Sequence, residues 1–219
     1  MFPVKMEEKS KQLPFGTAMI IVICTIVFWG RIIPSTGRGL IPLDFTYTFL
    51  HPQEEGVLKA MLMLFSSFFM HGGVLHLLGN MWYLWVFGVA LEGNIGSVKY
   101  VMFYMIYGIV SMVFQVAFDP ISTIPIVGAS GAIAGIMGMY LVMKPFSKLV
   151  IWFPPIFFFH VPAFLYLAFW FWLQWMNMSK VDASGMMVAW WAHIGGFLTG
   201  VLSGFWFKIS PNKRHLQKR

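Results

Sequence analysis

The chain alternates long apolar runs with short polar segments, and this pattern predicts a bundle of membrane-spanning helices. A helix needs about 20 apolar residues to cross a bilayer. The runs at 74–91 and 129–143 are short by this measure, but a short helix can end below the surface where protein covers its end. We therefore expect an all-α membrane protein, a six-transmembrane-helix bundle, with spans at 16–33, 74–91, 98–118, 129–143, 156–176 and 187–207.

The segment between the first two spans, residues 34–73, is too long for an ordinary connecting loop. It mixes polar residues with an apolar stretch from Val57 to Met70. We expect this first loop to be partly membrane-embedded, lying in the interface or re-entering against the other helices. An N-tail is expected at residues 1–15, of which 1–14 are largely charged and polar. The apolar run that follows, from Ala18 to Trp29, ends without a small-residue cleavage site, so we interpret it as a retained span.

Composition and charge agree with a membrane protein and indicate an orientation. The chain is 58% hydrophobic and only 11% charged, whereas soluble proteins carry about 25% charged residues. On the six-span topology, 11 of the 15 Lys and Arg residues fall on the side that holds both tails, including the basic C-tail at 208–219. Such a bias places both tails in the cytoplasm, and a plasma membrane is the expected location. Because the basic residues cluster in the two tails, the net charge of +7 does not indicate a nucleic-acid partner. The expected partner is the lipid bilayer.

The topology brings four polar residues to one depth. Counted along the chain, spans 2, 4 and 6 all enter from the outer face. His76 and Asn80 lie near the start of span 2, and Ser130 lies near the start of span 4. If span 6 starts near Met187, His193 lies ~9 Å along the helix axis. The four groups can therefore share one layer of the outer leaflet.

Stripes of small residues predict close packing of the helices that carry Ser130 and His193. At about 100° per residue, Ser130 lies at the edge of a small-residue face, and three glycines of span 6 fall within about 60° of His193. Such stripes let helix backbones approach closely in lipid. Support for this packing is expected from Gly131, Gly135, Gly196 and Gly200.

Serine and histidine at matched depth suggest nucleophilic catalysis. Taken alone, a serine among glycines is usually a packing residue, and a histidine in a span can be a satisfied helix–helix hydrogen bond. Ionisable groups within a span are nevertheless functional by default. No Asp or Glu lies in a span near His193, so a Ser–His dyad is a better interpretation than a triad.

Two further polar residues could stabilise an oxyanion. His76 and Asn80 are four residues apart and share one helix face. With the Ser130 backbone N–H, they could donate hydrogen bonds to a developing negative charge. The alternative is a polar pair bonded to a neighbouring helix. His71 lies just before this span, where it could hold water as an accessory group or simply be solvated.

The chain resembles the rhomboid intramembrane serine proteases at these residues. The resemblance covers nearly the whole chain, and its order and spacing fit a basic six-span rhomboid. It is carried by His71-Gly72-Gly73-Val74-Leu75-His76-Leu77-Leu78-Gly79-Asn80, Gly128-Ala129-Ser130-Gly131 and Ala192-His193-Ile194-Gly195-Gly196.

The resemblance implies a serine-type endopeptidase that cuts transmembrane protein substrates near the outer face, with no metal or cofactor. It implies that Ser130 is the nucleophile, that His193 is the general base, and that His76 and Asn80 are oxyanion donors. The catalytic domain would span 16–207. The chain departs from the family at Ala134, where members often have an aromatic residue that packs on the histidine. Some members also carry a Trp-Arg pair in the first loop, and residues 34–73 contain none.

Alternative functions would use the same intramembrane histidines without proteolysis. A transport protein or proton pathway could use His71, His76 and His193, although the spans lack the carboxylates that such pathways usually contain. A binding-only relative, or a haem anchor with paired histidines, is the other alternative. A binding-only relative would normally have lost Ser130 or His193, and both are present.

Overall fold

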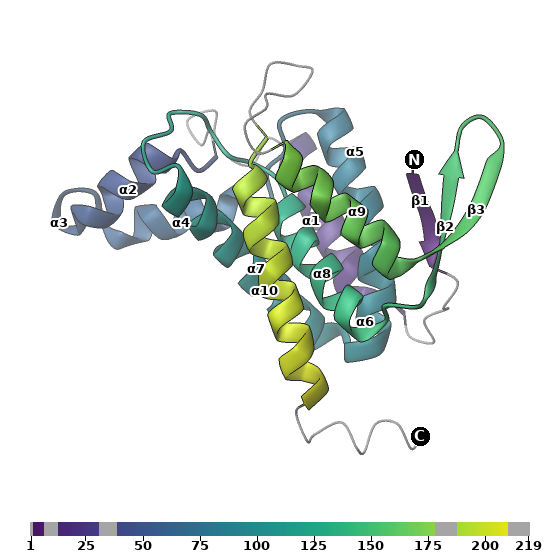
Figure 1. Ribbon diagram of the computed structural model, residues 1–219. Coiled ribbons are helices and arrows are strands. Elements are labelled where there is room, and N and C mark those ends of the chain that lie inside the picture. Colours follow the sequence, from purple (N-terminus) through teal and green to yellow (C-terminus); the bar gives the residue numbers. More distant parts are fainter. Residues whose placement is uncertain (1, 7–12, 31–38, 178–187, 210–219) are drawn as a thin grey trace.

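The computed structural model describes residues 2–6, 13–30, 39–177 and 188–209, and most of these residues are helical (Figure 1). Helix α5 (Val74–Tyr83) continues through a π-helical turn, Leu84–Gly88, into α6 (Val89–Ile95) without a break, and we call these three segments together the middle helix. The helices are α1 (Phe15–Gly30), α2 (Pro42–Leu50), α3 (Pro52–Glu55), α4 (Val57–Ser67), α5 (Val74–Tyr83), α6 (Val89–Ile95), α7 (Ser97–Phe118), α8 (Ser130–Met143), α9 (Ala163–Met176) and α10 (Trp190–Ile209).

Two of the described helices are long and apolar enough to cross a membrane. They run from Val74 to Ile95 and from Ser97 to Phe118. Shorter apolar helices occur at Phe15–Gly30, Ser130–Met143 and Ala163–Met176. The helix starts agree with the predicted spans within a few residues, except for the fifth. The predicted start of span 6, Met187, lies outside the described residues, as do most of the basic residues of the two tails.

The predicted helical bundle is confirmed in its main part, but the structure adds a three-stranded antiparallel sheet that the all-α prediction did not include. Its order is β1 (Phe2–Met6), β2 (Lys148–Phe153), β3 (Phe157–Pro162). The apolar run at 156–176 was expected to be one helix, but its first part pairs with β2. Pro162 explains the change, because a proline disfavours helical geometry in the residue before it. Helix α9 therefore begins only at Ala163.

The long first loop is helical along most of its described length. Helices α2, α3 and α4 project to one side of the bundle, and the sheet lies on the opposite side (Figure 1). In α4, Ala60, Leu64 and Ser67 are buried, while Leu58 and Leu62 are exposed. An exposed apolar face on this helix agrees with the expected placement of the loop at a membrane interface.

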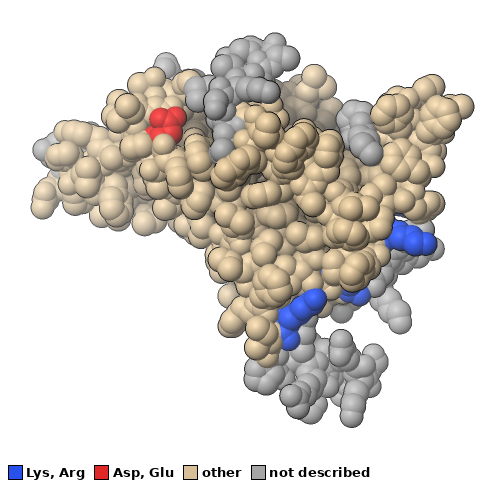
Figure 2. Space-filling model, viewed as in Figure 1, with Lys and Arg blue, Asp and Glu red and all other residues tan. Residues whose placement is uncertain are grey.

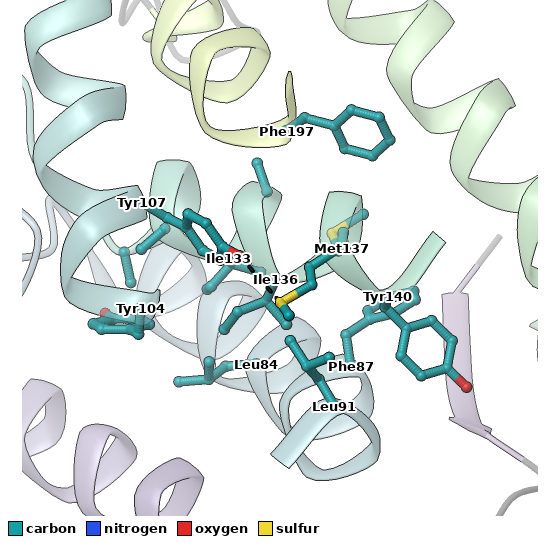
Figure 3. Packing of buried hydrophobic residues seen from close by; sticks show 14 of the residues in the cluster. Leu84, Phe87, Leu91, Tyr104, Tyr107, Ile133, Ile136, Met137, Tyr140 and Phe197 are labelled. Atoms are coloured by element: carbon teal, nitrogen blue, oxygen red, sulfur yellow. Dashed lines mark hydrogen bonds between the residues drawn. The ribbon is translucent and has the colours of Figure 1, made fainter. Parts of the chain in front are cut away.

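Helix α8 occupies the centre of the bundle. Every residue from Gly131 to Tyr140 is buried, which is typical of a helix that other elements surround. Figure 3 shows how the neighbouring helices contribute to this packing. The middle helix supplies Leu84, Phe87 and Leu91, α7 supplies Tyr104 and Tyr107, and α10 supplies Phe197.

The surface carries few charges. On the face shown in Figure 2, basic side chains lie near the end of α10 and beside the base of the sheet, an acidic group lies near α2, and the broad middle is uncharged. Among the described basic residues, Lys208 lies in the last turn of α10, and Lys144 follows the last residue of α8. An uncharged band above a basic end is what a bilayer requires of a protein that spans it.

A buried carboxylate joins the start of α1 to the end of the middle helix. Glu92 accepts hydrogen bonds from the backbone N–H of Gly16 (2.7 Å) and of Thr17 (2.8 Å). It also accepts from the hydroxyls of Thr17 (2.7 Å) and Ser97 (2.5 Å). The first N–H groups of a helix have no partner within it, so Glu92 caps α1 from a distant part of the chain.

Glu92→Ala is expected to lower the free energy of unfolding by about 3 kcal/mol or more, because it leaves several buried donors without an acceptor. Thermal unfolding in detergent micelles measures the change. Asn94→Ala is the matched control. Within the described part of the chain, the Asn94 side chain bonds only the Ala90 carbonyl of its own helix, and its removal is expected to cost about 1 kcal/mol or less. Equal losses in the two variants would contradict the capping role of Glu92.

Candidate active site

The site is built where α8 and α10 pack backbone against backbone. A Cβ added to Gly196 would overlap the carbonyl oxygen of Gly131, and one added to Gly200 would overlap that of Gly135. Gly138 approaches the Phe197 carbonyl in the same way. The two backbones therefore touch without side chains between them, which is the contact that small residues permit in membrane helices.

This contact brings Ser130 and His193 together. Ser130 is the first residue of α8 and His193 lies in the first turn of α10. The Ser130 Oγ lies 2.7 Å from His193 Nε2, within hydrogen-bond range. The start of α10 is also held by α7, where the Gln115 side-chain oxygen accepts the Ala192 N–H at 3.2 Å. A hydroxyl bonded to an imidazole is the arrangement that lets a histidine take the serine proton.

A third residue, which the sequence analysis missed, contacts the other nitrogen of the histidine. Gln174 of α9 places its Oε1 2.8 Å from His193 Nδ1, and it is 7% exposed. Gln174 carries no charge, whereas the third residue of a catalytic triad is expected to be Asp or Glu. Ser130 was singled out as a polar residue within an apolar span. The same criterion could have found Gln174, because it is the one amide side chain in the apolar helix Ala163–Met176.

The predicted oxyanion donors lie beside the residues that precede the serine. Gly128 has a φ of +123°, a conformation that favours glycine. A Cβ at Gly128 would lie 2.8 Å from His76 Nε2 and 3.3 Å from Asn80 Nδ2. Its own N–H donates to the Ser67 carbonyl at 2.9 Å, which ties this turn to α4.

Asn80 carries an unusual polar atom. Its Nδ2 is buried and has no hydrogen-bond partner among the described residues, although buried donors are almost always paired. The adjacent Gly128 leaves no Cβ in front of it. A donor without a partner beside Gly128, which precedes the predicted nucleophile by two residues, agrees with a group that binds a charge formed during a reaction.

His71 lies against His76, with ring centroids 5.3 Å apart. Its Nδ1 is 3.2 Å from the Phe69 carbonyl oxygen, which can only accept, so Nδ1 is the donor. Its Nε2 is then a buried acceptor without a partner in the described part of the chain. Burial, followed by the neighbouring His76, lowers the pKa of His71 to about 4, so this ring is neutral near pH 7. An accessory or water-holding role stays a prediction.

The position of Ala134 does not leave His193 without aromatic neighbours. Trp170 of α9 and Trp190 of α10 have ring centroids 6.1 Å and 6.0 Å from the imidazole. Ala134 itself is 1% exposed within α8. The family resemblance led us to expect an aromatic contact to His193 from α8. In this protein α9 and α10 supply the aromatic contacts instead.

Comparison with known sequences defines the class of this protein. The family model of the Rhomboid domain matches residues 58–209. The chain therefore belongs to the rhomboid family of membrane helical bundles, whose members are generally intramembrane serine proteases that act on membrane proteins.

Curated relatives extend the similarity to most of the chain. Rhomboid protein 1, mitochondrial, of Saccharomyces cerevisiae is 28% identical over 193 residues, which cover 83% of this chain and 52% of that protein. Presenilin-associated rhomboid-like protein, mitochondrial, of Rattus norvegicus is 29% identical over 191 residues, with coverages of 83% and 46%. RHOMBOID-like protein 1 of Arabidopsis thaliana is 34% identical over 163 residues, with coverages of 71% and 37%. The chain thus spans about half the length of these relatives or less.

The relatives contradict the predicted location. The yeast and rat proteins, each matched over 83% of this chain, are named as mitochondrial. The prediction of a plasma membrane with cytoplasmic tails is therefore wrong. The physical reason for the error is that a bias of Lys and Arg reports only which side of a membrane a loop occupies, not which membrane it is.

Proposed function

We propose that this chain is an intramembrane serine endopeptidase of a mitochondrial membrane that cuts transmembrane segments of other proteins. The observation that carries the proposal is the 2.7 Å contact between Ser130 Oγ and His193 Nε2. Membership of the rhomboid family supports it. A catalytic domain over residues 16–207, flanked by an N-tail and a basic C-tail, is part of the proposal.

The proposed mechanism follows from the positions of four groups. His193 accepts the Ser130 proton as Oγ attacks the scissile carbonyl, and a tetrahedral intermediate forms. Asn80, His76 and the Ser130 backbone N–H donate to its oxyanion. His193 then protonates the leaving amine, and a water molecule, activated by the same imidazole, hydrolyses the acyl-enzyme.

Six spans remain the topology that we propose for the bundle. They are α1, the continuous helix from α5 to α6, α7, α8, α9 and α10. The 14 residues of α8 extend only ~21 Å, less than the ~30 Å of a hydrocarbon core. With α8 ending near the inner surface, Ser130 would lie below the outer surface, where a transmembrane substrate can reach it.

The deciding experiment measures cleavage of a model single-span substrate in liposomes. Wild type is expected to cleave it, and Ser130→Ala is expected to leave it intact. A fluorophosphonate probe should label wild type on Ser130 only. Equal cleavage by wild type and Ser130→Ala would contradict the proposal and favour a contaminating protease, and ion flux through the liposomes without cleavage would favour transport.

Asn80→Ala is expected to lower kcat by about 10²- to 10³-fold, the usual effect of losing one oxyanion donor. KM should change little, because the donor acts on charge that develops after binding. Steady-state cleavage kinetics provide the measurement. The control is Asn177→Ala, since the Asn177 side chain donates to the Leu173 carbonyl at the end of α9, away from Asn80. An unchanged kcat in Asn80→Ala would remove Asn80 from the oxyanion site.

A further inference from the structure

We infer that Gln174 is a positioning residue that fixes the tautomer of His193, so that the site contains a neutral Ser–His–Gln triad instead of a dyad. The inference rests on the proposed function. It starts from the two hydrogen bonds of the Gln174 amide. Its Nε2 donates to the Trp170 carbonyl at 3.2 Å, and its Oε1 lies 2.8 Å from His193 Nδ1.

The Trp170 carbonyl determines the orientation of this amide. A backbone carbonyl can only accept a hydrogen bond, so the NH2 group of Gln174 must face it. The opposite orientation would replace this hydrogen bond by a contact between two acceptor oxygens, at a cost in free energy. The end of Gln174 that faces His193 is therefore its oxygen.

An oxygen acceptor determines the proton on the imidazole. His193 Nδ1 must carry the hydrogen, because only an N–H can donate to Gln174 Oε1. In a neutral imidazole, Nε2 is then the bare nitrogen, and the Ser130 hydroxyl donates to it. This is the tautomer that a general base needs. In serine proteases with a soluble fold a carboxylate holds the histidine in it, and here an amide would do so without a charge inside the membrane.

The position of Gln174 also explains how a site without an aromatic residue at Ala134 holds its histidine. Trp170 and Gln174 are one turn apart on α9, and both contact the His193 ring. One helix therefore supports the imidazole by packing and by a hydrogen bond.

The first test is the tautomer of His193 in the resting enzyme, measured by nitrogen NMR of protein labelled with ¹⁵N-histidine. The His193 signals are identified as those missing in His193→Ala. We expect wild type to carry the proton on Nδ1 and Gln174→Met to lose this preference. The matched control is Gln115→Met, which removes another buried glutamine that contacts the start of α10 but not the imidazole. It should leave the tautomer unchanged.

The second test is kinetic. Gln174→Met should lower kcat by about 10- to 100-fold, as expected for one lost buried hydrogen bond, with KM unchanged. Gln174→Glu, whose protonated carboxyl group can donate to the Trp170 carbonyl and accept from His193 Nδ1, should retain more of kcat than Gln174→Met. A proton on Nε2 in wild type, or an unchanged tautomer and kcat in Gln174→Met, would overturn the inference. Failure of the proposed function would look different, because wild type itself would not cleave while the tautomer would still be measurable.

Discussion

His193→Ala is expected to lower kcat/KM for a model transmembrane substrate by about 10⁴- to 10⁶-fold. Ser130→Ala should cause a loss of the same order, and the double variant should be no worse than either single one. The reason is that Ser130 Oγ and His193 Nε2 share one hydrogen bond and act in one proton transfer, so that removing either group removes the whole function. Cleavage rates of the three variants, measured at several substrate concentrations, provide the test.

The control for this series is His160→Ala. His160 lies in β3, paired with Val150, away from the contact between α8 and α10, and its replacement should leave kcat/KM within a few-fold of wild type. Thermal unfolding of each variant separates loss of catalysis from loss of fold. If the losses of the single variants multiplied in the double variant, the two residues would not act as a unit, and the proposed proton transfer would be wrong.

Gly200→Ala is expected to unfold the protein or to abolish cleavage, although it adds only one methyl group. That methyl would overlap the Gly135 carbonyl oxygen, and a backbone atom of a packed helix cannot rotate away. Overpacking usually costs about 1–3 kcal/mol, and we expect the upper end or more here. To relieve the overlap, α10 must move away from α8, which would lengthen the Ser130–His193 contact. Thermal unfolding and the cleavage rate measure the two effects.

Gly79→Ala is the matched control for this substitution. Gly79 also lies within a helix, α5, but a Cβ there meets nothing within 4 Å. Alanine is a better helix former than glycine by about 1 kcal/mol, so this variant should be as stable as wild type or slightly more stable. Equal destabilisation at the two positions would show that helix glycines in this protein tolerate no side chain for reasons unrelated to the contact between α8 and α10.

The sequence carried enough information to predict most helices and the pair at the centre of the site. Apolar runs locate membrane helices because lipid requires a nearly continuous apolar surface. Small-residue periodicity indicated that α8 and α10 would touch, and the structure brings Ser130 and His193 within 2.7 Å. The roles of these two residues stay predictions until cleavage is measured.

Two features could not be predicted, for different physical reasons. Strand β3 is as apolar as a membrane helix, and hydropathy alone does not distinguish the two. Its partner β2 lies next to it in the sequence, but the third strand, β1, lies about 140 residues before β2. Gln174 was missed because catalytic partners were sought among charged residues. A neutral amide accepts the hydrogen bond of a histidine without the cost of a buried charge. A membrane environment therefore favours glutamine over Asp or Glu at this position.

The backbone contact between α8 and α10 has a consequence for control of activity. Because main-chain atoms of Gly131 and Gly135 lie against Gly196 and Gly200, the spacing of the two helices does not depend on any side-chain rotamer. We therefore expect Ser130 and His193 to be in register in the resting protein, before a substrate arrives. Regulation would then have to act on the admission of substrate and water, since the reacting groups are already assembled.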